Sequence, residues 1–305
     1  MEYLFYLAGR LSCGRFNMDH RMYVSDAEPG LAPVVRPPVP AFMRTNSLLQ
    51  ATIGSSGTRT AALRIHEAGA LRLRFPRVGG ACEGIILNTS GGVAGGDRHT
   101  VEIALADNAH AALTTQSAEK FYRSEGELAQ VATRLTLCGS ANLAWLPQEA
   151  ILFDGARLSR RLDVEMAADA SLVIKESVVF GRTAMAEAMT HGLFRERWRI
   201  RRDGRLILAE DIRLDGDISA TLARAATGRG ARAIATIVQI GSGADVTATH
   251  LRDVLAGSSC DAGVSAWNGM LVLRLAGPDP HVVRATSSKI LTHLLPGVSP
   301  RIWSC

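Results

Sequence analysis

Three acidic residues lie where a charge is costly, and they are the residues of this sequence that point most clearly to chemistry. Asp97 ends the Gly-rich stretch Asn-Thr-Ser-Gly-Gly-Val-Ala-Gly-Gly-Asp at 88–97. Glu176 and Glu210 lie in stretches that alternate like β-strands, and each falls on the more apolar face of its stretch. Because an unpaired buried carboxylate is strongly unfavourable, these acids indicate either buried ion pairs or a wet, polar path through the protein.

Binding of a divalent cation is one chemistry that the three acids would support. Carboxylate and water ligands hold first-row metals less tightly than His and Cys do, which favours passage of an ion over permanent storage. The eight histidines include no His-x-His or His-x-x-x-His pair, so the sequence predicts no preformed tight site. The pattern therefore favours Asp97, Glu176 and Glu210 as oxygen ligands of a loosely held cation.

Each acid also has a purely structural explanation. Glu176 would be satisfied by an ion pair with Arg182 or with groups around Lys175, and a β-bulge would turn either strand acid outward. The acids would also fit the paired carboxylates of a glycoside hydrolase. Against that function, aromatic residues, which commonly bind sugar rings, are only 5% of the chain. The sequence also has no Gly-x-Ser-x-Gly nucleophile motif.

The Gly-rich stretch does not match a phosphate-binding loop. Gly91 and Gly96 have the Gly-x-x-x-x-Gly spacing, but Asp97 stands where such a loop carries its Lys. The Gly-x-Gly-x-x-Gly spacing of dinucleotide-binding folds is also missing from it. Glycine allows positive φ and close approach of other groups. Gly95 and Gly96 therefore predict either a shaped turn that presents a carboxylate or a simple tight turn between strands.

Short alternating stretches from residue 48 onward predict a mainly β fold. Asp203-Gly204 and Asn268-Gly269 are typical of two-residue hairpin turns, and Ala-Ala-Asp at 167–169 predicts a further hairpin. Helices are expected late in the chain, at 218–226, 245–256 and 280–295, the last with Asp279 as its N-cap. Strands are expected at 71–75, 100–106, 110–115, 127–138, 142–146, 158–166, 171–180, 193–202, 205–214, 264–267 and 270–275.

Composition narrows the class of protein. The 305 residues are 47% hydrophobic with a net charge of +5, and no apolar run approaches the roughly 20 residues that span a bilayer. Five scattered cysteines without a Cys-x-x-Cys pair argue against a zinc site or a disulfide scaffold, and they indicate a reducing compartment. We therefore expect a cytoplasmic protein that does not bind membranes.

Arginines at 195, 197, 199 and 201 share one face of a predicted strand. A solvated strand face explains this stripe most simply. The alternative is a docking surface for an acidic protein or for RNA. Since the overall charge is only mildly basic, we expect no nucleic-acid partner.

Residues 1–47 differ from the rest of the chain. Five prolines between residues 29 and 40 disfavour helix and sheet. We expect a poorly ordered tail here, which a start at Met18, Met22 or Met43 would shorten. A single β domain is expected over 48–305.

The most specific blocks of the sequence are Gly-Gly-Val-Ala-Gly-Gly-Asp at 91–97, Lys-Phe-Tyr-Arg-Ser at 120–124 and Trp-Leu-Pro-Gln-Glu at 145–149. Together they resemble the urease accessory protein family UreD, also called UreH. Further agreement lies at 69–76, 180–192, 202–206 and 300–303. The order and spacing agree from about residue 57 to residue 303, whereas the Pro-rich tail has no counterpart.

The resemblance implies a β-helical, helix-of-strands-like fold with two or three α-helices towards the C-terminus. It also implies a non-enzymatic scaffold, without catalytic residues or an organic cofactor. Such scaffolds bind apo-urease and UreF, which recruits the GTPase UreG, and they are thought to pass Ni²⁺ through an internal, water-filled channel to the urease metallocentre. The channel acids of the family fall by position on Asp97, Glu176 and Glu210. We add Glu119, Arg182, Gly95 and Gly96 as supporting residues, although relatives place a smaller polar residue at 119.

Overall fold

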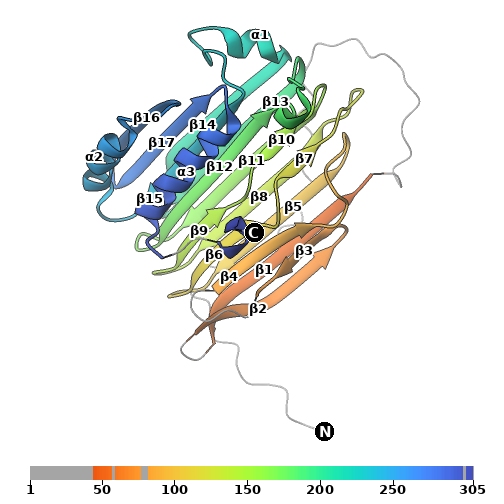
Figure 1. Cartoon of the computed structure of the whole chain (residues 1–305). Coiled ribbons are helices and arrows are strands. Elements are labelled where there is room, and N and C mark those ends of the chain that lie inside the picture. The colour runs from red at the N-terminus through yellow and green to blue at the C-terminus, as the bar shows by residue number, and fades with distance from the viewer. Residues whose placement is uncertain (1–43, 57–58, 77–81, 298–299, 305) are drawn as a thin grey trace.

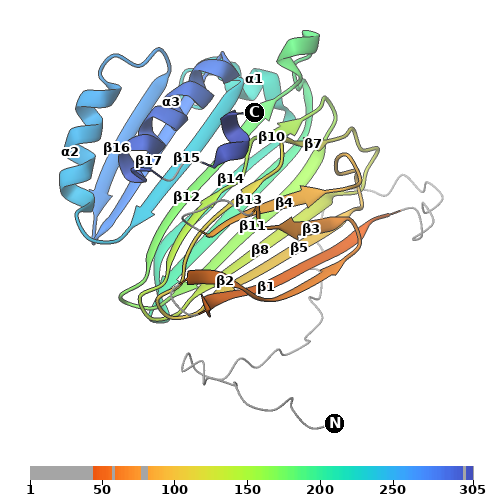
Figure 2. The ribbon, with the colours of Figure 1, turned by 60° about the horizontal axis from the view of Figure 1, so that its bottom comes forward.

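Two β-sheets lie face to face and make up most of the protein (Figures 1 and 2). The computed structural model describes residues 44–56, 59–76, 82–297 and 300–304. Sheet A has seven strands in the order β14-β13-β11-β8-β5-β1-β2. Its strands are β1 (Asn46–Ser56), β2 (Arg59–Ala68), β5 (Arg98–Leu105), β8 (Ala129–Leu137), β11 (Arg157–Met166), β13 (His191–Arg202) and β14 (Arg205–Asp217).

Sheet B has ten strands, with the main order β16-β17-β15-β12-β9-β6-β4-β3. Two short strands, β7 and β10, pair with each other, and β10 also pairs with β12. The strands of sheet B are β3 (Leu71–Arg74), β4 (Cys82–Asn88), β6 (His110–Thr115), β7 (Glu119–Phe121), β9 (Asn142–Leu146), β10 (Ala150–Leu152), β12 (Ser171–Phe180), β15 (Ala233–Ile240), β16 (Asp261–Trp267) and β17 (Met270–Gly277).

The central part of the chain winds as a β-solenoid, because its longer strands alternate between the two sheets. In sheet B, β4, β6, β9 and β12 pair in parallel. In sheet A, β5, β8, β11 and β13 also pair in parallel. Each turn of the chain thus adds one strand to each sheet, which confirms the predicted mainly β, β-helical arrangement.

The turns between strands correct one prediction and confirm two. Residues 167–170 connect β11 in sheet A to β12 in sheet B, so the hairpin predicted at Ala-Ala-Asp is wrong. The alternating pattern locates the break but does not say to which sheet the next strand belongs. The Asp203-Gly204 hairpin joins β13 to β14, and Asn268-Gly269 joins β16 to β17. All four turn residues have φ between 50° and 73°, as a two-residue hairpin requires.

Helices α2 (Ala244–Leu255) and α3 (Pro280–Leu294) cover the outer face of sheet B over β15 to β17 (Figure 1). Their apolar sides pack there with Leu271 and Leu273. The predicted N-cap of α3 is confirmed, since Asp279 Oδ1 accepts a hydrogen bond from the His281 backbone N–H at 2.8 Å. In the described part of the chain, no helix has the length and apolar character needed to cross a membrane.

Helix α1 (Ile218–Ala223) is shorter than the predicted 218–226. The carbonyl of Arg224 accepts backbone hydrogen bonds from Thr227, Gly228 and Arg229, so the chain closes into a turn rather than continuing the helix. Two 3₁₀ turns complete the described elements, η2 (Thr183–Met185) and η3 (Arg301–Ser304).

The predicted Pro-rich tail lies mostly outside the described residues, which begin at Arg44. Strand β1 starts at Asn46, close to the expected boundary. The division into a tail over 1–47 and one domain over 48–305 stays a prediction.

Candidate functional site

A row of polar residues crosses the space between the two sheets. On β12, Glu176 points inward between Ile174, which belongs to one apolar cluster, and Val178, which belongs to a second one. The same succession of apolar, polar and apolar inward residues recurs on neighbouring strands of both sheets. We call this row the interior polar layer; its members are Ser47, His99, Arg160, Glu176, Glu196, Glu210, Thr236 and Arg274.

Strand register aligns these residues along the solenoid axis, except for Glu210. Glu210 pairs with Trp198 and joins the row only through its contact with Arg274. In sheet B, Glu176 pairs with Thr236, and Thr236 pairs with Arg274, so the row runs from β12 to β17. In sheet A, Arg160 pairs with Glu196 on one side. On its other side the apolar Val131 separates Arg160 from His99 and Ser47, which lie in the same register. The layer therefore runs across coils of the solenoid rather than within one coil.

Arg160 joins the two sheets at the centre of the layer. Its Nη1 lies 2.7 Å from Glu176 Oε2 in sheet B, and its Nε donates to Glu196 Oε1 in sheet A at 2.6 Å. Trp145 Nε1 donates to the other Glu176 oxygen at 3.0 Å. The predicted inward position of Glu176 is thus confirmed, but the suggested partner Arg182 is wrong, since Arg160 pairs with it.

Burial and neighbouring charges shift the pKa values of the ionisable groups at this centre. The side chains of Glu176 and Glu196 are buried, and that of Arg160 is only 11% exposed. Burial raises the pKa of Glu196, which the charge of Arg160 partly opposes. The two neighbouring acids raise the pKa of Arg160 although burial works against its charge. One guanidinium thus faces two carboxylates, and with both ionised the group carries one excess negative charge.

Glu210 and Arg274 form the layer's solvent-facing end. Glu210 points inward with Leu208 and Ile212, as the alternation of residues along its strand predicted. Arg274 Nη2 lies 2.6 Å from both carboxylate oxygens of Glu210. The Arg274 side chain is 55% exposed and that of Glu210 17%. Since β14 is the edge strand of sheet A, the layer meets solvent here.

Asp97 has a backbone-fixing role in the structure. Its two oxygens accept backbone hydrogen bonds from Thr45 at 2.7 Å and Ala94 at 2.8 Å, and the side chain is buried. Asp97 thereby fastens the Gly-rich turn to the chain entering β1. It also lies beside His99: burial lowers the pKa of His99, and the Asp97 charge opposes that shift. His99 Nε2 has no hydrogen-bond partner among the described residues.

The supporting glycines make room for another loop. A side chain on Gly95 would collide with Ser124, and one on Gly96, whose φ is +89°, would collide with Glu127. Both glycines therefore allow the loop before β8 to approach the turn. They do not border the interior polar layer directly.

Arg182 also lies apart from the layer. It precedes the η2 turn, where its Nε donates to Glu187 at 3.0 Å. Its guanidinium carbon lies 4.3 Å from the centre of the Phe153 ring. These contacts indicate a role in shaping the loop after β12.

Glu119 is a further polar residue of the interior, on strand β7, which β10 connects to β12. It shares the face of β7 with the buried Phe121, and Asn88 Nδ2 donates to its Oε1 at 3.1 Å. Burial raises the pKa of Glu119 from 4.5 to about 6, although the bond from Asn88 works in the opposite direction. This acid therefore titrates close to neutrality.

The acids predicted together do not form one coordination sphere. Three strands separate β5, which Asp97 precedes, from β14, which carries Glu210. That separation is roughly 19 Å at the usual strand spacing. Within residues 44–56, 59–76, 82–297 and 300–304, no three His, Cys, Asp or Glu residues group to hold a metal. The predicted set is thus spread along the interior.

Sequence reasoning missed Arg160, Glu196, His99 and Arg274. All four share the inward face of their strands with buried apolar residues. Glu196, for example, alternates with Phe194 and Trp198. The alternation argument that selected Glu176 would have found Arg160, Glu196 and His99. It would not have found Arg274, because the leucines of β17 lie on the opposite face.

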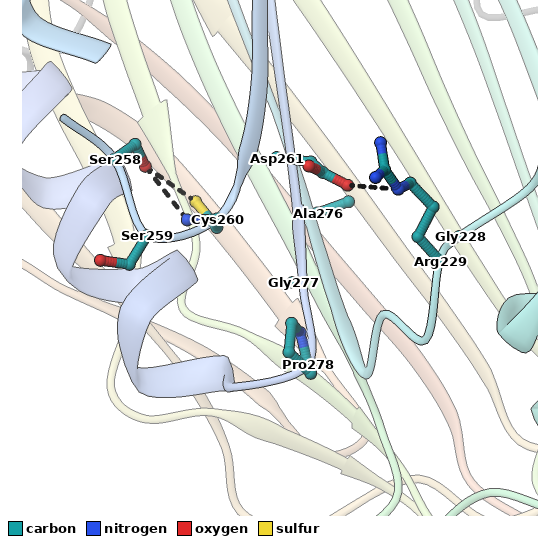
Figure 3. Close-up of a pocket in the computed structure, with 9 residues that line it drawn as sticks. All are labelled: Gly228, Arg229, Ser258, Ser259, Cys260, Asp261, Ala276, Gly277 and Pro278. Carbon is teal, nitrogen blue, oxygen red and sulfur yellow. Dashed lines mark hydrogen bonds and ion pairs between the residues drawn. The ribbon is translucent and has the colours of Figure 1, made fainter. Parts of the chain in front are cut away.

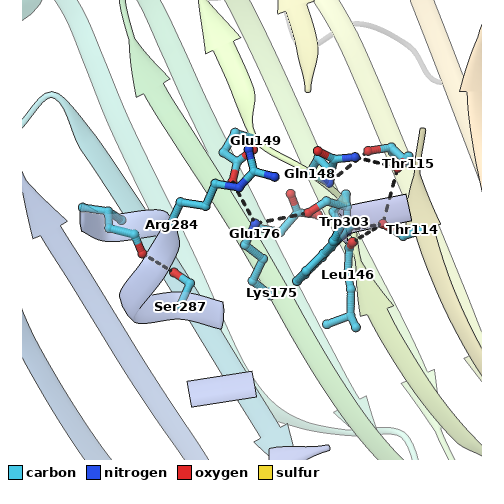
Figure 4. Close-up of polar contacts among 12 residues, drawn as sticks. Thr114, Thr115, Leu146, Gln148, Glu149, Lys175, Glu176, Arg284, Ser287 and Trp303 are labelled. Atoms are coloured by element: carbon cyan, nitrogen blue, oxygen red, sulfur yellow. Dashed lines mark hydrogen bonds and ion pairs between the residues drawn. The ribbon is translucent and has the colours of Figure 1, made fainter. Parts of the chain in front are cut away.

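A second buried ionic cluster lies on the opposite, outer face of β12 (Figure 4). Lys175 Nζ lies 3.5 Å from Glu149 Oε1, and Arg284 of α3 lies 3.9 Å from the same oxygen. The Trp303 ring lies 5.2 Å from Lys175 Nζ, and Trp303 Nε1 donates to Thr114 Oγ1 at 2.9 Å. This cluster fastens α3 and the η3 turn to sheet B.

An open pocket of about 320 Å³ lies beside the ends of β16 and β17 (Figure 3). Arg229 and Asp261 face each other there at 3.8 Å, and Cys260 Sγ lies 3.2 Å from Ser258 Oγ. Its lining contains one carboxylate and no histidine. A glycoside hydrolase needs two carboxyl groups, so this pocket does not support that alternative.

The arginine stripe on β13 is partly exposed to solvent, and two of its members pair with acids. Arg195 pairs with Asp211, and Arg201 pairs with Glu165 at 3.3 Å. Arg199 donates to the backbone oxygen of Glu210 at 3.0 Å. These contacts support the solvated strand face more than an RNA surface.

Comparison with known proteins identifies close relatives. The family model described as UreD urease accessory protein matches residues 47–304. A protein named Urease accessory protein UreD from Methylobacterium sp. (strain 4-46) is 46% identical over 254 residues, or 81% of this chain and 90% of the relative. Urease accessory protein UreD 2 from Methylorubrum populi is 42% identical over 274 residues, or 87% of this chain and 92% of the relative. A UreD from Rhodopseudomonas palustris (strain HaA2) is 44% identical over 241 residues, or 79% and 86%.

Proposed function

The chain belongs to the UreD family of urease accessory proteins, and from this premise we propose that it is a non-enzymatic scaffold for urease maturation in the cytoplasm. It would bind apo-urease and UreF, and through UreF the GTPase UreG. Its cargo would be Ni²⁺ on the way to the urease metallocentre. No organic cofactor, nucleic acid or membrane is part of this proposal.

The interior polar layer is the observation that carries the proposal. It offers carboxylate, hydroxyl and imidazole groups between two apolar clusters, and these groups are spread over successive strands. Oxygen and imidazole ligands both suit Ni²⁺. Because the ligands are distributed and not gathered, an ion would be held weakly at each point, which suits passage.

The charged residues of the layer would attract a cation and admit it from solvent. The Arg160–Glu176–Glu196 group has one carboxylate more than it has guanidinium, so with both acids ionised an entering cation would meet one excess negative charge. At the solvent-facing end, the exposed Arg274 would leave Glu210 to admit the ion. Asp97 would act mainly by holding the Gly-rich turn and by lying beside His99.

Coexpression with urease, UreF and UreG tests this function. We expect the chain to co-purify with UreF and urease. In Glu176→Gln and Glu210→Gln variants, the complex should still assemble while the nickel content of urease falls. Asp211→Asn is the matched control, because Asp211 follows Glu210 but points outward to Arg195. Full nickel loading by both Gln variants would contradict the proposal.

A further inference from the structure

Two histidines far apart in sequence meet on the outer helical layer. His250 lies in the middle of α2, and His293 lies near the end of α3. His250 Nε2 is 3.3 Å from His293 Nδ1, and the ring centres are 5.0 Å apart with the ring planes at 69°. Both side chains are exposed. From this geometry we propose that the pair is a surface site for a divalent transition-metal ion such as Ni²⁺, Cu²⁺ or Zn²⁺.

The distances fit two ligands of one ion. Imidazole nitrogens that each lie ~2.1 Å from an ion, at an angle of roughly 100–105°, are about 3.3 Å apart, and their ring centres are about 5.1 Å apart. Two rings that point straight at each other with the same nitrogen separation would have centres about 5.6 Å apart. The observed 5.0 Å between ring centres therefore matches nitrogens that converge on a shared point.

The fold holds this geometry in place. Leu251 and Leu294, the residues after each histidine, are buried in the cluster between the helices and sheet B. Both helices thus lie on the same face of the sheet (Figure 2). They also contact each other. Because the backbones are anchored by packing, the two imidazoles need little ordering to bind an ion.

The chemistry of the pair defines what it would bind. Imidazole suits Ni²⁺, Cu²⁺ and Zn²⁺, whereas Mg²⁺ and Ca²⁺ prefer oxygen ligands. With two protein ligands, the remaining positions on the ion would be filled by water. The site would therefore bind weakly and exchange its ion readily. Sheet B separates it from the interior polar layer, so this inference does not rest on the proposed function.

Calorimetric titration of the full chain with Ni²⁺ tests the site. His250→Gln, His293→Gln and the double variant are compared with His281→Gln, which removes an exposed histidine from the first turn of α3. We expect each single change at the pair to weaken this binding on the order of tenfold or more, as losing even an outer-shell partner can. The double variant should bind no better than either single variant, and His281→Gln should match the wild type.

Pulsed electron paramagnetic resonance with Cu²⁺ gives an independent count of imidazole ligands. We expect two coupled imidazoles in the wild type and one after either substitution at the pair. Unchanged nickel affinity in His250→Gln or His293→Gln would overturn the proposal. A single coupled imidazole in the wild-type copper spectrum would overturn it too.

Discussion

Arg274 Nη2 lies 2.6 Å from both carboxylate oxygens of Glu210, although the two residues come from different sheets. Glu210 is on β14 and Arg274 is on β17, so their ion pair links the edge of sheet A to sheet B. Arg274 is half exposed and Glu210 is largely covered. The pair therefore marks the place where polar groups inside the solenoid reach solvent.

Replacing Arg160 by Met should strongly destabilise the fold. The change leaves Glu176 and Glu196 facing each other in the interior without a counter-charge. Removing one partner of a buried ion pair typically costs about 3–5 kcal/mol. Urea unfolding should report a loss of this size in the free energy of unfolding.

Arg134→Met is the control for that change. Arg134 pairs with Glu102 at 2.8 Å on the outer face of sheet A, where both side chains are partly exposed. Its loss should cost less than about 1 kcal/mol. Adding Glu176→Gln and Glu196→Gln to Arg160→Met should recover part of the lost stability. Equal costs for Arg160→Met and Arg134→Met would contradict the assignment of a buried charge centre.

Asp97→Ala should loosen the Gly-rich turn. The substitution leaves the backbone N–H groups of Thr45 and Ala94 without their carboxylate acceptor, which costs about 1–3 kcal/mol for a buried donor. Hydrogen exchange should become faster at both of these amides. Asp97→Asn, which keeps one carbonyl oxygen, should lie between Ala and wild type. Unchanged exchange in Asp97→Ala would show that the carboxylate does not hold the turn.

Glu119→Gln should change how stability depends on pH. Burial raises the folded-state pKa of Glu119 to about 6, so folding favours its protonated form. That stabilising contribution is complete below the unfolded-state pKa and is lost as pH rises through the folded-state value. The upward shift from 4.5 to about 6 corresponds to about 2 kcal/mol.

The measurement compares urea unfolding of wild type and variant at several pH values. Relative to Glu119→Gln, the wild type should lose about 2 kcal/mol of stability between about pH 4.5 and pH 7.5. Glu102→Gln is a suitable control, because Glu102 is a partly exposed acid on β5. If the difference in stability between wild type and Glu119→Gln did not depend on pH, burial would not raise the pKa of Glu119.

The sequence predicted the type of fold and the inward position of two acids because strand alternation is local. Parity places Glu176 and Glu210 with apolar neighbours, and the structure keeps them there. The alternation along one strand does not say which strand faces it in the other sheet. Arg160 pairs with Glu176 only because the solenoid places β11 and β12 in facing sheets.

Other features depend on contacts that no local pattern carries. The bonds from Thr45 and Ala94 occupy the carboxylate of Asp97, and the first of these comes from a segment 52 residues earlier. His250 and His293 have no spacing that suggests a metal site, since their proximity arises from packing two helices on one sheet. Such features require the tertiary structure.

Thr236→Leu tests the central claim most directly. Thr236 lies between Glu176 and Arg274 in the strand register, is buried and carries no charge. Leucine there would interrupt the interior polar layer without leaving any charge unpaired, and Thr236→Ser, which keeps the hydroxyl, is the matched control. The measurement is the nickel content of urease matured with each variant, after confirming that the complex assembles. We predict low nickel with Leu and wild-type nickel with Ser; full nickel loading by an assembled Thr236→Leu complex would contradict passage of Ni²⁺ through the layer.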